Sequence, residues 1–212
     1  MTVARPTTAK LDQSRIRAAA LALVDAEGLD GLSMRRLAAA LDVTAASLYF
    51  HYATKGDLLE ALASDVLADV DTSAFTLGWE EGLRAWARSL RAALAAHPRL
   101  VPVIAQAPGR RADALQRAED VHGGLVDAGW PPREATMIGA AAKYLVFGAA
   151  TASFAAGFAA EPELYADRYP HLRDAHRIAA LGEQIDRESF DYALDRLVEG
   201  LRGRYAALRH GS

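Results

Sequence analysis

Apolar residues recur every three or four positions through the first third of the chain, which is the spacing of helices that bury one face. These positions are Ile16, Ala20, Leu23 and Val24, then Met34, Leu37, Ala38 and Leu41, then Leu58, Leu59, Leu62 and Val66. Residues suited to capping helix N-termini stand at Ser33, Thr44 and Thr54. The pattern predicts four helices. The third runs from Thr44 to about His51 and follows a tight connection at Asp42 and Val43.

Helical spacing continues after a polar, glycine-ended joint at residues 71–78, where five or six further helices are expected. A long helix is predicted from Pro131 to about Gly157, and a final helix from about Arg187 to Leu208. Residues 161–171 contain two prolines and are expected to form a loop. Since no strand pattern appears, the prediction is an all-α fold of about nine or ten helices.

The absence of cysteine in the 212 residues excludes a disulfide scaffold, a thiolate zinc site and a cysteine nucleophile. It fits a reducing compartment, and residues 1–13 show no secretory signal, so a cytoplasmic protein is expected. Residues 135–160 hold one charge, Lys143, but the run is mostly alanine and glycine and is not expected to cross a membrane.

Charge is distributed unevenly along the chain. The net charge is −3, yet residues 1–56 carry two more basic than acidic side chains. The sign of this asymmetry is the one expected of a basic DNA-reading region on an acidic body. Arg5 and Lys10 lie in a segment, residues 1–10, that is expected to be either a minor-groove arm or a solvated tail.

The second and third predicted helices form the pattern of a helix-turn-helix, which places the second of the two in the DNA major groove. A capped N-terminus favours phosphate there, and small or hydrogen-bonding residues in the first turn let the helix enter the groove. Thr44, Ala45, Ala46 and Ser47 meet this requirement. Tyr49 and His51 lie on the same strip of the helix, and Lys55 stands where it can reach phosphate. This predicts DNA binding.

The segment from Leu11 to Leu62, with GLDGLSMRRLAAALDV and SLYFHYATKGDLLEAL as its most specific pieces, resembles the DNA-binding domain of the tetracycline-repressor (TetR) family. The downstream segments WEEGLRAWARSLRAALAAHP and FDYALDRLVEGLRG resemble the C-terminal domain of tetracycline repressors. The resemblance implies an arm at residues 1–10, a helix-turn-helix domain at 11–56 and a ligand-binding and dimerisation domain at 57–212.

The resemblance also implies roles for individual residues. Arg35 would contact the operator, Thr44 and Ser47 would meet base edges or backbone, and phosphates would be held by Tyr49, His51 and Lys55. Ala45 and Ala46 can touch only a thymine methyl group, so the operator sequence is not carried over. A homodimer, formed through the long helix and the final one, would bind a palindromic operator and act most often as a repressor.

A small-molecule effector in the C-terminal domain is implied as well. The segment from Leu100 to Pro108 lacks the histidine with which tetracycline repressors bind a magnesium chelate, so we expect an apolar or aromatic effector and no metal or cofactor. Candidate pocket residues are Trp86, Ile104, Gln106, His122, Lys143, Phe147, Thr151 and Phe154. On the long predicted helix, one face carries Lys143, Phe147, Thr151, Phe154 and Phe158. This aromatic stripe also fits plain protein core or a dimer interface. Lys143 either extends to solvent or meets an anionic group.

Two rival classes are a helical enzyme and a helical adaptor that does not bind DNA. The sequence contains no GxSxG, no HExxH and no glycine-rich phosphate loop. His171 and His176 are five positions apart, a poor spacing for one helix face, and are expected at the surface. Steep salt dependence of binding to a promoter fragment would separate a DNA-binding regulator from both rivals.

Overall fold

A computed structural model describes residues 11–106, 112–165 and 168–210 of the chain, and every regular element in these ranges is helical. The all-α prediction is therefore confirmed. Ten α-helices occur in the described part, together with short 3-10 turns between residues 73 and 172. The α-helices are α1 (Gln13–Glu27), α2 (Met34–Leu41), α3 (Ala45–His51), α4 (Lys55–Val66), α5 (Trp79–Ala96), α6 (Val101–Gln106), α7 (Ala112–Asp127), α8 (Pro132–Thr151), α9 (His176–Ala180) and α10 (Gly182–His210).

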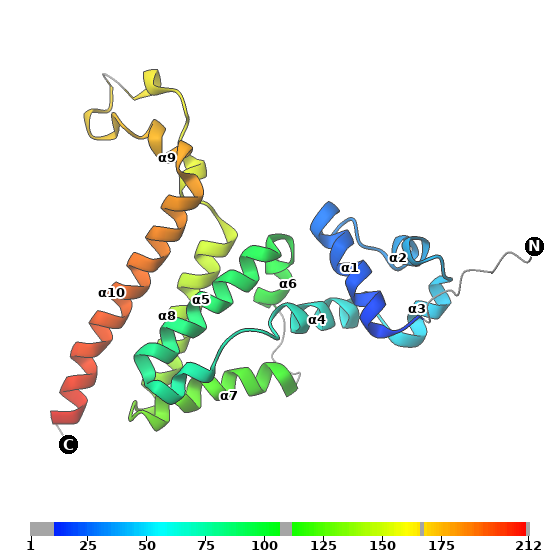
Figure 1. Ribbon diagram of the computed structural model, residues 1–212, viewed down its shortest axis with the longest axis horizontal. Coiled ribbons are helices and arrows are strands. Elements are labelled where there is room, and N and C mark those ends of the chain that lie inside the picture. Colours follow the sequence, from blue (N-terminus) through cyan, green and yellow to red (C-terminus); the bar gives the residue numbers. More distant parts are fainter. Residues whose placement is uncertain (1–10, 107–111, 166–167, 211–212) are drawn as a thin grey trace, which may run out of the picture.

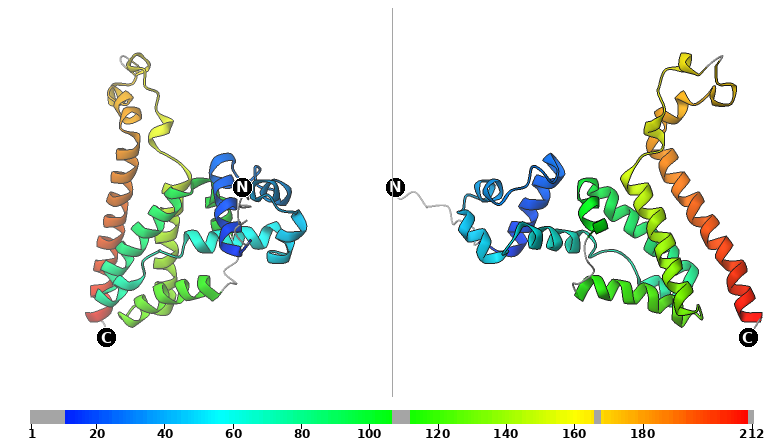
Figure 2. Two further views of the ribbon diagram at one scale, coloured as in Figure 1. Left: turned by 45° about the vertical axis from the view of Figure 1, so that its right-hand side comes forward. Right: turned by 180° about the vertical axis from the view of Figure 1, so that it is seen from behind.

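The helices form two groups that share α4. The head, which is α1 to α3, lies at one end of the molecule, and the body, which is α5 to α10, lies at the other (Figure 1). Helix α4 extends from the head to the body, and α10 lies on the side of the body remote from the head (Figure 2). The predicted domain boundary between residues 56 and 57 falls in the first turn of α4.

Local capping explains where the head helices begin. The predicted caps are confirmed: the Ser33 hydroxyl accepts a hydrogen bond from the Arg36 amide, the Thr44 hydroxyl from Ser47 and the Thr54 hydroxyl from Asp57. Each bond satisfies an amide that the first turn of a helix leaves without an intrahelical partner. The short helices α2 and α3 therefore have defined starting points despite lengths of 8 and 7 residues.

The turn between α2 and α3 depends on a left-handed backbone conformation at Asp42, with φ 54° and ψ 49°. Aspartate is one of the few non-glycine residues that visit this region readily. The conformation lets the Val43 amide bond back to the Ala38 carbonyl at 3.0 Å, which ends α2 and turns the chain at once into α3. The predicted tight connection is confirmed.

A buried core and polar contacts between helices hold the head together. Ile16, Leu37 and Leu48 are each 0% exposed and come from α1, α2 and α3. Arg17 on α1 donates to the Tyr52 hydroxyl at 3.1 Å and forms an ion pair with Asp65 on α4. These hydrogen bonds, first to Tyr52 and then to Asp65, raise the pKa of the Arg17 guanidinium above its ordinary value.

The body is built around α5 and α8, with α7 and α10 against them (Figure 1). An aromatic cluster closes one end: the ring centroids of Trp79 and Trp130 are 5.3 Å apart, and Tyr205 lies 5.2 Å from Trp130. Ion pairs fix α10 to its neighbours, Arg202 with Glu80 and Arg204 with Glu134. Because Trp130 and Tyr205 come from segments far apart in sequence, the cluster ties the C-terminal helix to the rest of the body.

The prediction of a long helix to about Gly157 was wrong, because α8 ends at Thr151. The Thr151 hydroxyl bonds back to the Phe147 carbonyl at 2.8 Å, and the backbone at Ala152 is extended. Asp186, in the first turns of α10, then accepts hydrogen bonds from the Phe154 and Ala155 amides. The final helix begins at Gly182, earlier than predicted, and the 3-10 turns at Pro162 and Pro170 lie in the expected loop.

Across the described ranges, no helix combines the length and the hydropathy needed to span a bilayer. The run at residues 135–160 illustrates why. Its helical part, within α8, packs Ile138, Ala142 and Val146 into the protein core.

Candidate functional site

The first turn of α3 is open and lined by small side chains. The hydroxyls of Thr44 and Ser47 lie 2.9 Å apart, so Thr44 both caps the helix and holds Ser47 in place. Ala46 is exposed, whereas Ala45 and Ser47 are half-buried. No bulky side chain from these four positions blocks the approach of a partner to the helix N-terminus.

The aromatic residues of α3 point outward around a buried leucine. Leu48 is 0% exposed, Tyr49 is 51% exposed and Phe50 is 88% exposed. His51 is half-buried and meets the Phe50 ring edge-on, with 5.6 Å between the centroids. Phe50 was not predicted as a site residue. The sequence could have indicated its exposure, because Phe50 does not lie on the helix face that buries Leu48.

The two described cations of the predicted site, Arg35 and Lys55, differ in their surroundings. Arg35 is exposed and, within the described residues, makes no hydrogen bond or ion pair, whereas its neighbour Arg36 is paired with Glu27. Lys55 is half-buried, and its ammonium donates to the Leu29 carbonyl at 2.9 Å. Lys55 therefore ties α4 to the loop between α1 and α2. Arg5 and Lys10 lie outside the described residues.

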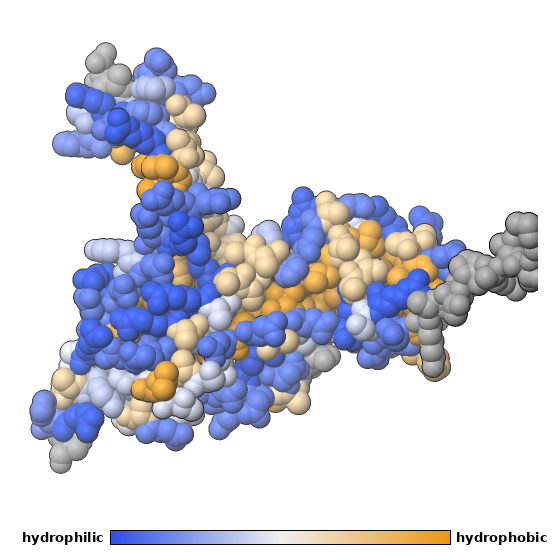
Figure 3. Space-filling view, viewed as in Figure 1, coloured by the Kyte–Doolittle hydropathy of each residue, from blue (hydrophilic) through white to orange (hydrophobic). Residues whose placement is uncertain are grey.

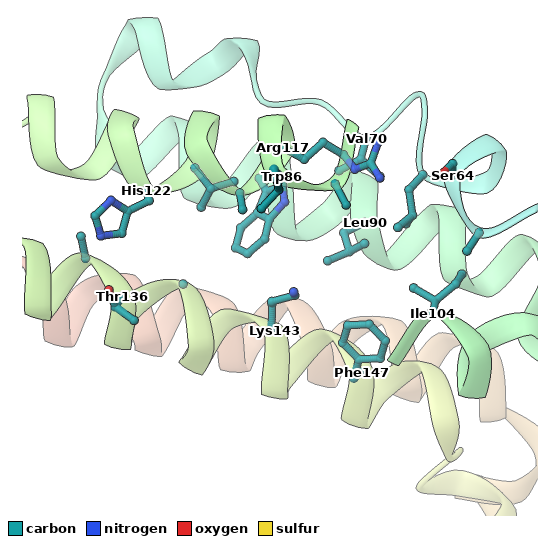
Figure 4. Close-up of a pocket in the computed structure, with 18 of the residues that line it drawn as sticks. Ser64, Val70, Trp86, Leu90, Ile104, Arg117, His122, Thr136, Lys143 and Phe147 are labelled. Carbon is teal, nitrogen blue, oxygen red and sulfur yellow. The ribbon is translucent and has the colours of Figure 1, made fainter. Parts of the chain in front are cut away.

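The body contains a cavity of about 370 Å³ between α4, α5, α6, α7 and α8 (Figure 4). This volume is in the range of small-molecule binding sites. The wall is mainly apolar, with a few polar groups. The lining residues are Glu60, Ala63, Ser64, Leu67, Val70, Trp86, Leu90, Ile104, Ala114, Leu115, Arg117, Ala118, Val121, His122, Ala135, Thr136, Gly139, Lys143 and Phe147.

The structure brings five of the predicted ligand-binding residues together in this cavity: Trp86, Ile104, His122, Lys143 and Phe147. Three others lie elsewhere. Gln106 lines a shallower cleft of about 320 Å³ between α4, α6 and the loop after α1. Thr151 is exposed and bonded to its own helix, and Phe154 is 63% exposed in the segment after α8. The predicted stripe failed at its C-terminal end because α8 stops before it reaches Phe154.

The polar groups of the cavity wall differ in whether they have partners. Arg117 donates Nη2 to Asp113 at 3.2 Å. A hydrogen bond from Ser64 and then the ion pair with Arg117 lower the pKa of Asp113 to about 2. The Nε2 atom of His122 lies 3.2 Å from the Pro132 carbonyl. Lys143 makes no hydrogen bond or ion pair among the described residues.

Sequence reasoning missed two parts of the cavity wall. The α4 residues Glu60, Ala63 and Ser64 were not predicted, because the helical spacing in this segment marks only the apolar face formed by Leu58, Leu59, Leu62 and Val66. Arg117 precedes Val121 and His122 at helical spacing, so the interruption of an apolar face could have indicated it. Among the described residues no group of three or more histidine or carboxylate side chains is placed to hold a metal ion.

Two connections join the cavity to the head. Helix α4 packs on α1, and its residues Glu60, Ala63 and Ser64 line the cavity. In addition, Nδ1 of His97, at the end of α5, lies 2.9 Å from the Asp25 carboxylate on α1. Figure 3 shows apolar surface at the junction of head and body. Leu29, Leu59 and Val103 line the shallower cleft.

Comparisons with known proteins agree with this geometry. Residues 16–62 match the family described as bacterial regulatory proteins, tetR family, and residues 76–205 match the tetracyclin repressor-like C-terminal domain. The class A tetracycline repressor protein from transposon 1721 of Escherichia coli is 32% identical over 209 residues, with 95% of each chain covered.

Solved structures show the same arrangement. A possible TetR family regulator from Streptomyces coelicolor A3(2) is 31% identical with a TM-score of 0.74, covering 91% of this chain and 99% of the other. ActR from Streptomyces coelicolor in complex with actinorhodin is 28% identical with a TM-score of 0.72, covering 92% and 98%. The helix-turn-helix head and the helical body are thus both matched, and the chain belongs to the TetR family of DNA-binding transcriptional regulators, which are not enzymes.

Proposed function

We propose that this protein is a repressor that binds a near-palindromic operator as a homodimer and releases it when a small apolar or aromatic molecule occupies the cavity. One observation carries the proposal: α4 leaves the head and forms a wall of the cavity. A ligand that favours one position of α4 changes the spacing of the two α3 helices in the dimer. Such coupling is typically worth about 1–3 kcal/mol, or about 5–150-fold in DNA affinity.

For DNA recognition we assign α3 to the major groove. Thr44 and Ser47 face base edges or backbone, and Ala45 and Ala46 can contact thymine methyl groups. Tyr49, His51 and Lys55 hold phosphates. Arg35, exposed on α2 and unpaired among the described residues, contacts a base or a phosphate. The N-terminus of α3 is supported by its cap rather than by bulky neighbours, which suits insertion into a groove.

The homodimer is supported by apolar surface on α8 and small residues on α10. On α8, Met137 is 47% exposed and Tyr144 is 77% exposed, and Ala141 and Gly148 lie on the same side. On α10, Gly200 and Gly203 are exposed, and a Cβ added at either position meets no atom of the described residues within 4 Å. Packing α8 and α10 against the same pair of a second copy forms a four-helix interface with two-fold symmetry.

Two relatives support repression and ligand release. The Escherichia coli relative is named a repressor, and ActR, which has a similar fold, has been crystallised in complex with actinorhodin. The cavity of this chain is lined by Trp86, Leu90 and Phe147, which suits a flat apolar ligand.

DNA binding is tested by fluorescence anisotropy with the DNA fragment upstream of this protein's own coding sequence. We expect affinity to fall steeply as salt rises, as release of counterions from phosphates requires. Footprinting should show two half-sites about 34–36 Å apart or a multiple of that distance. A single asymmetric half-site, or no binding even at low salt, would contradict the proposal.

Ligand release is tested with a cavity-filling variant and a matched control. Cβ atoms added at Gly139 and Gly123 meet no atom within 4 Å, but only Gly139 lines the cavity. Gly139→Leu should bind the operator fragment and lose release by aromatic compounds that act on the wild type, whereas Gly123→Leu should keep that response. Equal responses of the two variants would place the effector outside this cavity.

A further inference from the structure

We propose that the effector is an aromatic acid, whose carboxylate, sulfonate or ionised phenol group pairs with Lys143 inside the cavity. The inference rests on the proposed function, since it names the chemical class of the molecule that the cavity takes. It is carried by the position of Lys143, by the lack of a partner for its charge and by the apolar surfaces around it.

Lys143 lies in the middle of the cavity wall. It projects from α8 between Thr136 and Phe147, and its amine points across the cavity towards the side formed by Trp86 and Leu90 (Figure 4). A helix residue that only extends to solvent would point away from α5 and α7. Lys143 is exposed to solvent and also lines the cavity, so its charge is available to a ligand that enters the site.

The charge of Lys143 is unbalanced in the described part of the molecule. No carboxylate oxygen there lies within 4.0 Å of its Nζ, and no hydrogen bond satisfies it. Arg117 on the opposite wall differs, because Asp113 already pairs with it at 3.2 Å. Because Lys143 is exposed, water hydrates its ammonium in the unliganded protein, and a ligand that brings an anion to it gains affinity through a charge-assisted hydrogen bond.

Glu60 is the acidic residue among those that line the cavity, and a negative charge there could select a cationic ligand instead. Its position argues against that role. Glu60 belongs to α4 at the edge of the cavity and also lines the shallower cleft beside Gln106, so it faces two openings. Lys143, in contrast, lines only the main cavity and not the shallower cleft.

The surroundings of Lys143 specify the rest of the ligand. Trp86 and Phe147 offer aromatic surfaces, and Leu90, Ile104 and Val121 complete an apolar wall. Such walls lower the local dielectric constant and strengthen a charge pair formed between them. A flat hydrocarbon or heteroaromatic body that carries one acidic group satisfies both parts of the site.

Two probes that share a skeleton test this proposal. 1-Anilinonaphthalene-8-sulfonate carries an acidic group, and N-phenyl-1-naphthylamine is the same skeleton without it. Their dissociation constants are measured by fluorescence titration of the full-length dimer at neutral pH. We expect Lys143→Met to weaken binding of the sulfonate about tenfold, as loss of a charge-assisted hydrogen bond should. Binding of the neutral probe should stay within about threefold.

Three further variants locate the effect. Lys143→Arg keeps the charge and should restore most of the sulfonate affinity. Arg133→Met removes a positive charge from the exposed first turn of the same helix, about 15 Å along its axis, and should change neither probe. Gly139→Leu should weaken both probes, because it fills the cavity in which they bind.

Specific results would overturn the proposal. Equal effects of Lys143→Met on both probes, or no effect on the sulfonate, would show that Lys143 selects no anion. Loss of sulfonate binding in Arg133→Met would assign the preference to general surface charge. These titrations contain no DNA: a protein that prefers the anionic probe but ignores operator DNA fails the proposed function alone, and one that binds DNA without this preference fails the present inference alone.

Discussion

Asp113 on α7 lies 3.2 Å from Arg117, and its pKa is lowered first by the side chain of Ser64 on α4 and then by Arg117, so one carboxylate joins α4 to the wall of the cavity. Ser64 and Arg117 both line the cavity. A ligand that moves either of them changes the bonds of Asp113. In the function proposed above, this carboxylate is part of the route by which a ligand in the cavity would act on α4.

This arrangement predicts a stability that depends on acid pH. The pKa of Asp113 is about 2, against 3.8 for an unperturbed group. Because the folded pKa is depressed, the stabilisation is complete above about pH 4 and disappears as pH falls towards 2. The side chain is 37% exposed, so after solvent screening we expect about 1 kcal/mol.

Asp113→Asn should lose that stabilisation at pH 7 and show a flatter pH dependence of unfolding below pH 4, measured by urea denaturation. The control is Glu119→Gln, an exposed acidic residue on the same helix. Identical pH profiles for wild type and Asp113→Asn would mean that the carboxylate contributes nothing to stability.

Lys55 is expected to have two separable roles. Its hydrogen bond to Leu29 is a contact of a charged group, so Lys55→Met should lower the free energy of unfolding by about 1–2 kcal/mol. If it also holds a phosphate, the slope of log affinity against log salt should decrease by about 1. The control is Arg99→Met, which deletes an exposed positive charge of the body. An unchanged salt slope would limit Lys55 to its structural bond.

Tyr49 is predicted to contact a phosphate rather than a base. Tyr49→Phe removes only the hydroxyl and should weaken binding about fivefold, and by the same factor for operator and unrelated DNA. Tyr169→Phe, in the segment after α8, should leave both affinities unchanged. Competition assays with single base-pair substitutions check this prediction. A selective change at one base pair would show that Tyr49 reads sequence.

The dimer face on α8 can be tested without disturbing the fold of one protomer. Gly148 is exposed, and a Cβ added there meets no atom within 4 Å. Gly148→Glu should therefore fold, but it places a charge in the proposed interface and should give monomers by sedimentation velocity, with operator affinity strongly reduced. Gly123→Glu, an equally open position on α7, should remain dimeric. A dimeric Gly148→Glu would place the interface elsewhere.

The sequence predicted best what depends on neighbouring residues. The caps at Ser33, Thr44 and Thr54 each bond an amide three positions later, so their role is legible in the local sequence. The residue at which α8 ends could not be predicted from its neighbours in sequence. It depends on Asp186, which caps the segment around Phe154 from a distant helix.

The cavity was predicted only in part for the same reason. Lys143 and Phe147 share one helix face, and a spacing of four residues was enough to group them. The wall formed by α4 requires knowing that Ser64 meets Asp113 across two separate segments. Periodicity shows that a helix buries one face, but it does not show what that face packs against.

Helix α4 has a consequence for how such regulators can be recombined. Because α4 contacts α1, in part through the Arg17–Asp65 ion pair, and also lines the cavity, no point within α4 separates the head from the body without cutting contacts on both sides. A hybrid that joins this head to a foreign body just before Lys55 keeps the DNA surface but severs Arg17 from Asp65 and Lys55 from Leu29. A hybrid that keeps α4 with the head preserves these contacts. Its cavity-lining residues, such as Glu60, Ala63 and Ser64, must then be adapted to the new body.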